Sequence, residues 1–363
     1  MTSATKNCSE VKQTSTVNVA IAVIHYKEQY LLGFRNSTQH QGNLYEFVGG
    51  KIDDHENAEQ AVVREVAEET GIDLSQNTIV KLGRVHHDYG DKQVSLQIYK
   101  SELSEQQYEQ HQYLQYGLEQ QPLKWVERQA LLAGKYPLPA ANNTILEWIK
   151  LPTQIAITYP LAHFSESSEP ATEWLNYHIE NLSAAAWVYI RVKGAERDQM
   201  VAELMNKRPD LQMILPYRDS VVCDSLAHTE SKVDDPAVAY HLTHTDLMQW
   251  DMSANSNAEP SRVLCKERPF IVSCHDIASI EAANRLADAR IEKQLPPVMA
   301  IFVSPVLSTK THPDAAPLGW ESWSELAQLA DMPVIGLGGL SPSMIGQAAQ
   351  FGGVSVAGIR QFL

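Results

Sequence analysis

The second half of the chain consists of short apolar runs that alternate with helical patterns. There are eight such runs: QIAITY, AAWVYIRV, LQMILPY, VAYHLT, PFIVSC, VMAIFVSPV, PVIGLGG and VSVAGI. Most of them precede a helical pattern, such as AERDQMVAELMNKR or DIASIEAANRLADARI. Eight strands that alternate with helices over about 210 residues are typical of a (β/α)8 barrel. No segment repeats at a fixed period, which argues against a solenoid.

The length of the chain leaves room for a second domain before the barrel. The chain has 363 residues, whereas one ordinary domain takes roughly 100–200. The first residues are rich in Ser, Thr, Lys and Gln, a composition that favours disorder. We therefore predict an α/β protein with a disordered lead at residues 1–16, a first domain at 17–151 and a TIM barrel at 152–363.

Composition and charge narrow the functional classes. With 44% hydrophobic and 20% charged residues, the chain reads as an ordinary soluble globular protein. It has neither the run of about 18 apolar residues that a membrane helix needs nor a signal-peptide core, so we expect a cytoplasmic location. Its four cysteines lie far apart without a CxxC pair, which favours reduced thiols. The net charge of −15 argues against a nucleic-acid polymer as partner, but is compatible with a small phosphate ester held by metal ions.

The first domain is predicted to contain strands, one amphipathic helix and a closing helix. Strand-like runs cover 17–26, 30–35, 78–89 and 92–103, and helical patterns cover 58–71 and 142–152. We expect the Gly-containing segment 40–51 and the Gln-rich segment 104–121 to be loops.

Three carboxylates crowd one face of the amphipathic helix. Glu65, Glu68 and Glu69 are spaced at i, i+3 and i+4, where like charges repel unless something positive offsets them. Clustered hard oxygen ligands suit Mg²⁺ or Mn²⁺, especially where substrate phosphates complete the coordination. The preceding Gly-Gly pair lets the loop backbone approach the same metals, and Arg64 is placed to orient one glutamate. The alternative is an acidic helix face that only meets solvent.

This segment resembles the Nudix box, G-x5-E-x7-R-E-U-x-E-E-x-G-U, in which U is aliphatic. Residues 50–72 match every fixed position of that motif. The resemblance covers residues 17–151 and implies the Nudix α/β/α sandwich fold. Within the superfamily the chain is most similar to the MutT type, the 8-oxo-dGTP diphosphatases, on the segments EFVGGK, GLEQQPLKW and PAANNTI. It departs from the family at Val48, where proline is usual.

The resemblance also implies roles for individual residues. The metal ligands would be Gly49 through its carbonyl, Glu65, Glu68, Glu69 and Glu119, with Arg64 beside them. Arg35 and Lys51 would contact the substrate, Arg35 at a phosphate. Asn142 would read the purine edge, since its amide offers an acceptor and two donors. The alternative for Asn142 is a helix N-cap.

The implied reaction is the Mg²⁺-dependent hydrolysis of 8-oxo-dGTP to the monophosphate and pyrophosphate, which would sanitise the nucleotide pool and serve DNA repair. Metal ions would neutralise the polyphosphate and lower the pKa of a bound water. That water would attack phosphorus roughly in line with the leaving group.

The last two barrel strands end in glycines that could hold a phosphate. Loops after strands seven and eight commonly bind phosphate in such barrels. Backbone N–H groups of Gly338, Gly339 and Gly358 could hold the anion, and Thr309 and Thr311 could add hydroxyl donors. The alternative is that these glycines only form the tight turns that close the barrel.

Residues 153–363 resemble thiamine-phosphate synthase and its TenI-like relatives. The similar segments are RVK, SPVLSTKTHP, APLGW, PVIGLGGL and GVSVAGI. Pro216-Tyr217-Arg218 replaces the Asn-Asp pair of the synthases, and Ser304-Pro305 replaces the TenI-type histidine. These departures indicate a degenerate barrel that binds a phosphate ligand. The polar residues left at its mouth are Arg191, Lys193, Asp246 and His275. The last of these also fits a scaffold role.

Three hypotheses follow from the two resemblances. The first is a nucleotide-pool pyrophosphohydrolase that carries a degenerate barrel. The second is a thiamine-pathway enzyme, in which the barrel makes or senses thiamine phosphate and the Nudix domain cleaves damaged thiamine diphosphate. The third is a barrel that reads a phosphate ligand and regulates the hydrolase.

Overall fold

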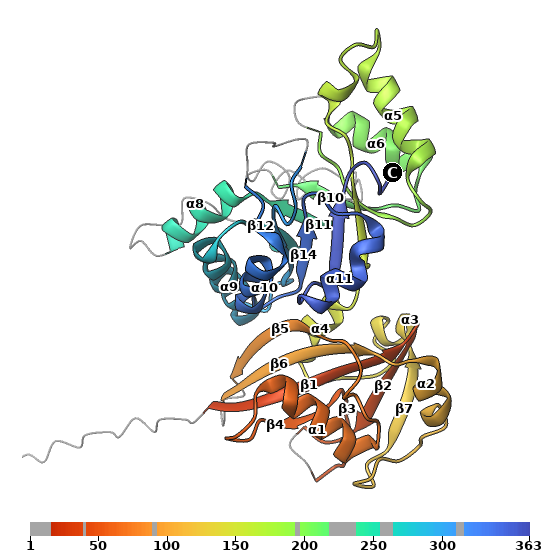
Figure 1. The fold of residues 1–363 in the computed structure, drawn as a ribbon, viewed down its shortest axis with the longest axis vertical. Coiled ribbons are helices and arrows are strands. Elements are labelled where there is room, and N and C mark those ends of the chain that lie inside the picture. The colour runs from red at the N-terminus through yellow and green to blue at the C-terminus, as the bar shows by residue number, and fades with distance from the viewer. Residues whose placement is uncertain are drawn as a thin grey trace, which may run out of the picture.

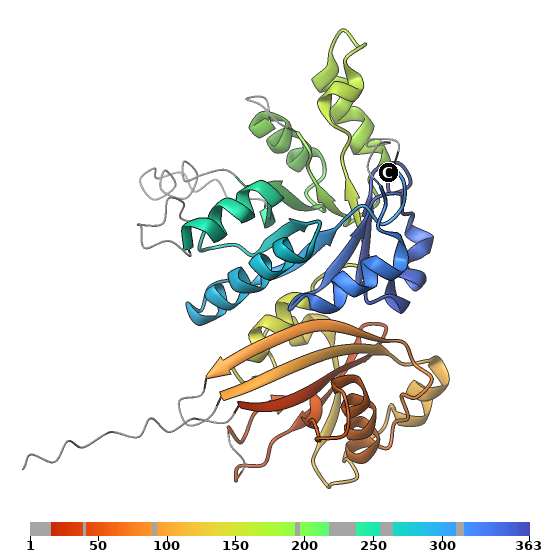
Figure 2. The same ribbon diagram turned by 60° about the vertical axis from the view of Figure 1, so that its left-hand side comes forward.

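An open mixed sheet and a closed barrel form the two lobes of the molecule (Figures 1 and 2). The computed structural model describes residues 16–38, 41–88, 93–192, 197–217, 237–254, 264–309 and 316–363. The lead predicted at residues 1–16 lies outside the described residues except for Thr16, which begins the first strand.

The first lobe is built on a seven-stranded sheet. Its order is β3-β2-β1-β6-β5, with β4 paired to β1 and β7 paired to β2. The two longest neighbours, β1 and β6, run parallel, and the other pairings are antiparallel. The elements are β1 (Thr16–Tyr26), β2 (Gln29–Phe34), β3 (Tyr45–Glu46), β4 (Val48–Lys51), α1 (Ala58–Thr70), β5 (Ile79–Asp88), β6 (Gln93–Glu102), α2 (Glu105–His111), β7 (Leu123–Glu127), α3 (Arg128–Leu132) and α4 (Asn142–Trp148).

Helix α1 begins and ends where its sequence predicts. Asn57 caps it through a capping box with Gln60, and Gly71 ends it at a φ of 76°. Its buried face packs against the sheet, so the opposite face, which carries the glutamates, is left for the site.

Two segments that we expected to be loops contain regular structure. Residues 48–51 form β4 because this Gly-rich stretch pairs with residues 19–22 of β1, a partner that local sequence does not reveal. Helix α2 forms inside the Gln-rich segment, where Ser104 and Gln107 make a capping box.

The second lobe is a closed barrel of eight parallel strands, as predicted. The strand order is β10-β11-β12-β13-β14-β15-β8-β9. The elements are β8 (Gln154–Ile157), η1 (Leu161–Phe164), α5 (Pro170–Asn181), β9 (Trp187–Tyr189), α6 (Arg197–Lys207), β10 (Gln212–Pro216), β11 (Ala237–Leu242), α8 (His244–Ala254), β12 (Phe270–Cys274), α9 (Ile277–Glu292), β13 (Val298–Val303), α10 (Gly319–Leu329), β14 (Val334–Leu337), η2 (Pro342–Met344), α11 (Ile345–Gln350) and β15 (Ser355–Gly358). Among the described helices, none is long and apolar enough to cross a membrane.

Two of the three apolar clusters belong to one lobe each, and the third spans both. One cluster lies between α1 and the sheet, and another fills the interior of the barrel. The third joins the other face of the sheet and α4 to the helices and strand ends of the barrel. The two lobes therefore share a continuous core.

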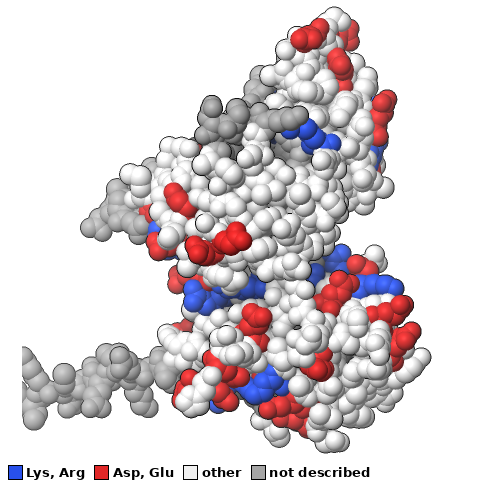
Figure 3. Space-filling view, in the orientation of Figure 1, with Lys and Arg blue, Asp and Glu red and all other residues white. Residues whose placement is uncertain are grey.

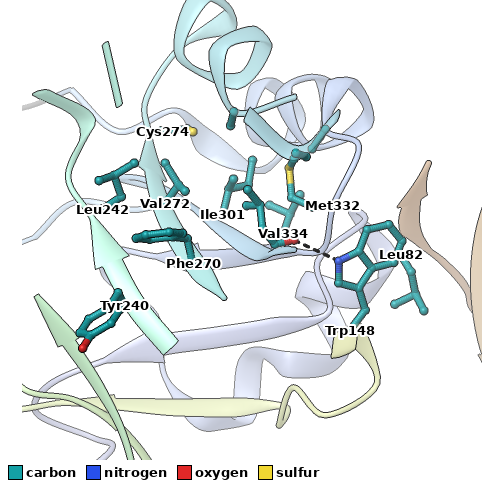
Figure 4. Close-up of a cluster of buried hydrophobic side chains, with 14 of the residues drawn as sticks. Leu82, Trp148, Tyr240, Leu242, Phe270, Val272, Cys274, Ile301, Met332 and Val334 are labelled. Carbon is teal, nitrogen blue, oxygen red and sulfur yellow. Dashed lines mark hydrogen bonds between the residues drawn. The ribbon is translucent and has the colours of Figure 1, made fainter. Parts of the chain in front are cut away.

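The sheet meets the barrel at the base, where the barrel strands begin. Trp148 of α4 donates an indole N–H to the carbonyl of Val298, the first residue of β13, at 3.1 Å (Figure 4). Arg84 of β5 pairs with the buried Asp331, which precedes β14, at 2.9 Å. Gly83 has a φ of 157°, and a Cβ there would lie 2.5 Å from the Asp331 carbonyl oxygen. Figure 3 shows basic and acidic side chains close together along this junction.

Candidate active site

Two consecutive glycines bring the loop before α1 close to its neighbours. Gly49 has a φ of 152°, and a Cβ there would lie 2.1 Å from the Ala20 carbonyl oxygen. A Cβ on Gly50 would lie 2.2 Å from the carboxyl carbon of Glu65. The carboxylate of Glu65 therefore lies directly against the loop backbone, and a side chain at residue 50 would require it to move.

Arg64 joins the loop to the helix. Its guanidinium contacts both carboxylate oxygens of Glu56, at 2.6 and 3.1 Å, and donates to the carbonyl of Lys51 at 3.0 Å. It also donates to Glu65 at 2.9 Å and to Glu68 at 3.0 Å. Arg64 thus contacts three glutamates, while Lys51 contributes its carbonyl and its side chain is exposed.

A second group of carboxylates gathers around Glu69. Burial, followed by the nearby charges of Glu46, Glu65 and Glu119, raises the pKa of Glu69 to about 8. The pKa of Glu65 is raised as well, first by burial. Glu119 is exposed and is held near by its loop, in which the Leu118 N–H donates to the carbonyl of Glu69 at 2.8 Å.

The chemistry of this group fits a divalent cation. Its donors are hard carboxylate oxygens, and burial together with the neighbouring negative charges favours the protonated form of Glu69 unless a positive charge is supplied. Glu68 turns toward Arg64 and its side chain is 56% exposed. Within the described part of the chain, no three His, Cys, Asp or Glu side chains are already arranged as a metal site. The glutamates would therefore have to be drawn together by the ion.

A pocket opens beside the carboxylates, on the face of the sheet that carries α4. Arg35, Glu46, Gly49 and Asn142 contribute to its lining, with Val94 among its apolar residues. Arg35 donates from Nε to the carboxylate of Glu46, whose pKa is raised mainly by burial.

Glu46 was missed from the sequence. Strands β2 and β3 pair in a register that sets Gly33 opposite Glu46 and Phe34 opposite Tyr45. This register brings Arg35, which follows β2, close to Glu46 on β3. Such a pairing becomes visible only when the strands are aligned.

Asn142 lines the pocket with a side-chain amide that is not used elsewhere. The residue is 6% exposed, and its side chain has no hydrogen bond to any described residue. The N-cap of α4 is Ala141, without a side-chain cap, so the alternative reading of Asn142 as an N-cap is wrong. Its backbone N–H donates to the carbonyl of Pro139 at 2.9 Å.

At the barrel mouth, two of the predicted phosphate loops pack together. Leu307 donates its N–H to the carbonyl of Gly338 at 3.0 Å, and a Cβ on Gly338 would lie 3.4 Å from the Thr309 methyl group. Gly339 has a φ of 71°, and a Cβ there would lie 2.7 Å from the Leu307 Cβ. Gly358 instead lies under the ring of Phe362. Thr311 and Lys193 lie outside the described residues.

The other residues predicted at the mouth contact the scaffold. Arg191 donates its backbone N–H to the Thr158 hydroxyl oxygen at 2.8 Å. Asp246 accepts from the Thr243 hydroxyl at 2.7 Å in the first turn of α8. His275 lies 3.0 Å, through Nδ1, from the carbonyl of Ser304.

His241 is a further mouth residue that the sequence did not single out. It is buried, its Nε2 lies 2.7 Å from the Ser273 hydroxyl, and burial lowers its pKa to about 4.

Comparison with known families agrees with this division of the molecule. Residues 19–148 match the family described as NUDIX domain, and residues 241–362 match the family described as Thiamine monophosphate synthase. The 8-oxo-dGTP diphosphatase of Proteus vulgaris is 38% identical over 95 residues, which is 24% of this chain and 83% of that protein. The 8-oxo-dGTP diphosphatase of Escherichia coli is 28% identical over 135 residues, 37% of this chain and 96% of that protein.

A relative of the barrel domain matches this chain over a shorter stretch. The "Putative thiamine-phosphate synthase 2" of Aquifex aeolicus is 35% identical over 63 residues, 17% of this chain and 34% of that protein. Among solved structures, MutT from Aliivibrio salmonicida and Vibrio cholerae matches at 25% identity with a TM-score of 0.29, over 37% of this chain and 97% of that one.

Through its first domain, the chain belongs to the Nudix hydrolase family. More particularly, this domain is MutT-like, with 8-oxo-dGTP diphosphatases among its homologues, and it is joined to a thiamine-phosphate synthase-like barrel.

Proposed function

We propose that the protein hydrolyses oxidised purine nucleoside triphosphates, 8-oxo-dGTP first, to the monophosphate and pyrophosphate with Mg²⁺. The observation that carries this proposal is the pairing of two features in one place. A carboxylate group in which Glu69 has no ion pair with a described residue lies next to a pocket whose buried Asn142 amide has no hydrogen bond to a described residue. The first feature suits a metal–polyphosphate and the second suits a base edge.

The residues would divide the work between phosphate and base. Glu65, Glu68, Glu69, Glu119 and the Gly49 carbonyl would hold the Mg²⁺ or Mn²⁺ ions, which when bound neutralise the polyphosphate and lower the pKa of water. Arg64 holds the glutamates against the loop, and Arg35 would contact a phosphate.

The base would enter the pocket. There Asn142 can pair with its edge, and apolar residues such as Val94 can cover its ring. Because an unpaired buried amide is costly, a base that leaves this amide unsatisfied binds less well.

The barrel mouth would bind a small phosphate ester as a separate ligand. The support is the close packing of the loops that carry Thr309, Gly338 and Gly339, whose backbone conformations require glycine. Backbone N–H groups at such positions bind anions without a charged side chain.

A product-resolved hydrolysis screen of the whole protein with Mg²⁺ tests the substrate. It compares 8-oxo-dGTP, the four ordinary dNTPs, and thiamine diphosphate with its oxidised forms, by ratios of kcat/KM. We expect 8-oxo-dGTP to be preferred and pyrophosphate to be released. A preference for a thiamine diphosphate would replace this proposal with the thiamine-pathway hypothesis.

The variant Asn142→Ala tests whether the Asn142 amide recognises the base. We expect the preference for 8-oxo-dGTP over dGTP to fall by about tenfold, since a buried hydrogen bond is lost on one substrate only. Asn143→Ala is the matched control, because Asn143 follows Asn142 on the same helix and is exposed. Equal losses on both nucleotides would remove Asn142 from base recognition.

A further inference from the structure

Helix α4 runs from the substrate pocket to the barrel. Its first residue, Asn142, lines the pocket, and its last residue, Trp148, is buried against the barrel base (Figure 4). Trp148 lies six positions after Asn142, a rise of about 9 Å along an α-helix. Figure 1 shows the helix between the sheet and the barrel.

Trp148 is held on both sides. Its indole N–H bonds to the Val298 carbonyl on the barrel, and a Cβ on Gly83 of β5 would lie 2.7 Å from its ring. With 2% of its surface exposed, the ring fixes the end of α4 between the two lobes.

The pocket end of α4 has fewer restraints of its own. Its N-cap, Ala141, supplies no side-chain hydrogen bond, and a helix of seven residues is too short to be stable alone. At the other end, Arg128 donates to the carbonyls of Ile149, at 2.9 and 3.2 Å, and of Lys150, at 3.1 Å. The direction of the helix, and with it the place of the Asn142 amide, is therefore set at its C-terminal end.

We propose that Trp148 is a positioning residue for Asn142, so that the barrel base sets the substrate preference of the Nudix domain. This inference rests on the proposed function only in that Asn142 contacts the substrate. It assigns the barrel a task in hydrolysis that requires no ligand at the barrel mouth.

The test compares two tryptophans that make the same bond. Trp148 and Trp323 each donate an indole N–H to a backbone carbonyl of β13, at 3.1 Å in both cases, and both are buried. Trp323 packs inside the barrel lobe, away from α4. Trp148→Phe and Trp323→Phe thus delete the same bond from two places.

We expect Trp148→Phe to raise KM for the best substrate of the wild-type protein by about fivefold. The value of kcat should stay within about twofold, since the glutamates are not touched. Trp323→Phe should change neither constant. Equal KM values for the two variants, or a KM shift in both, would overturn the inference.

A double-mutant cycle with Asn142→Ala shows whether Trp148 acts through Asn142. The KM effect of Trp148→Phe should disappear when Asn142→Ala is already present, because the group to be positioned is gone. An undiminished KM effect in that background contradicts the inference. Arg128→Gln, which releases the same helix end from the surface, should reproduce the KM rise and serves if Trp148→Phe does not fold.

The substrate screen separates this inference from the proposed function. If the best substrate is not an oxidised purine nucleotide, the proposed function fails, yet the cycle can still be measured on whichever substrate is best. If 8-oxo-dGTP is best and Trp148→Phe behaves like Trp323→Phe, the inference alone fails.

Discussion

The carboxylate site and the barrel mouth both combine glycine loops with polar side chains, but they treat charge differently. At the mouth, Asp246 accepts from Thr243 and His275 contacts the Ser304 carbonyl, so these polar groups serve the scaffold. At the carboxylate site, Arg64 engages Glu56, Glu65 and Glu68, while Glu69 keeps a strongly raised pKa. The difference favours the carboxylate site, rather than the barrel mouth, as the place where a cation would bind.

The largest effect is expected when one charge is removed from each of the two sites. We expect Glu69→Gln to lower kcat by about a thousandfold, because a metal-facing carboxylate is lost at nearly constant volume. Asp246→Asn should leave hydrolysis unchanged. Steady-state kinetics with Mg²⁺ and far-UV circular dichroism measure the activity and the fold. Full activity of Glu69→Gln would refute the metal assignment.

A second test addresses the junction of the lobes. Gly83→Ala should lower the free energy of unfolding by about 2–4 kcal/mol, since its Cβ would meet the Asp331 carbonyl oxygen and the Trp148 ring. Gly346→Ala is the matched control, because a Cβ there meets nothing within 4 Å. Urea unfolding of both variants gives the comparison. If Gly83→Ala is as stable as Gly346→Ala, the close approach at the junction is not a restraint.

A third test uses pH. His178 accepts at Nε2 from the Tyr159 N–H, and its Nδ1 lies 2.7 Å from the Trp174 carbonyl oxygen, so the neutral ring suits both partners. Burial lowers its pKa to about 4, and that of His25 in the first lobe to about 3. Unfolded histidine titrates near 6.5. Stability is therefore full above pH 6.5 and is lost as the pH falls toward these folded values.

Each such histidine should contribute a slope of about 1.4 kcal/mol per pH unit across its window. Unfolding free energies measured between pH 7 and 5 check the slope, and His178→Gln should reduce it by one such increment. An unchanged slope in that variant would mean that His178 does not titrate as its surroundings indicate.

The smallest expected effect concerns the barrel mouth. Thiamine monophosphate should change the rate of nucleotide hydrolysis by less than about twofold, because the mouth and the Nudix lobe lie at opposite ends of the barrel strands. Initial rates with and without the ligand decide this. A larger change would favour the regulatory hypothesis over the others.

Much of this fold could be predicted from local patterns. All eight barrel strands coincide with apolar runs in the sequence. The ends of α1 are indicated by its caps at Asn57 and Gly71. Strand β4 could not be predicted, because it forms by pairing with β1, which is distant in the sequence. Helix α2 carried a readable signal in Ser104 and Gln107, which its polar composition obscured.

The site was predictable where a motif of fixed spacing exists and not where partners meet in space. Arg64 holds the glutamates that its spacing indicated. Glu46 joins Arg35 only through strand register, and Trp148 meets Val298 only because the lobes dock. The apolar face of a helix predicts that another element covers it, but it does not indicate which element.

The segment that connects the two lobes is short and restrained. Only residues 149–153 separate α4 from β8, and the carbonyls of Ile149 and Lys150 are bound by Arg128. A tether of this kind cannot act as a hinge, so the molecule should diffuse and tumble as a single particle. A recombinant in which this Nudix domain is moved to a different barrel would need to carry along both α4 and a β13 whose first carbonyl can receive its tryptophan.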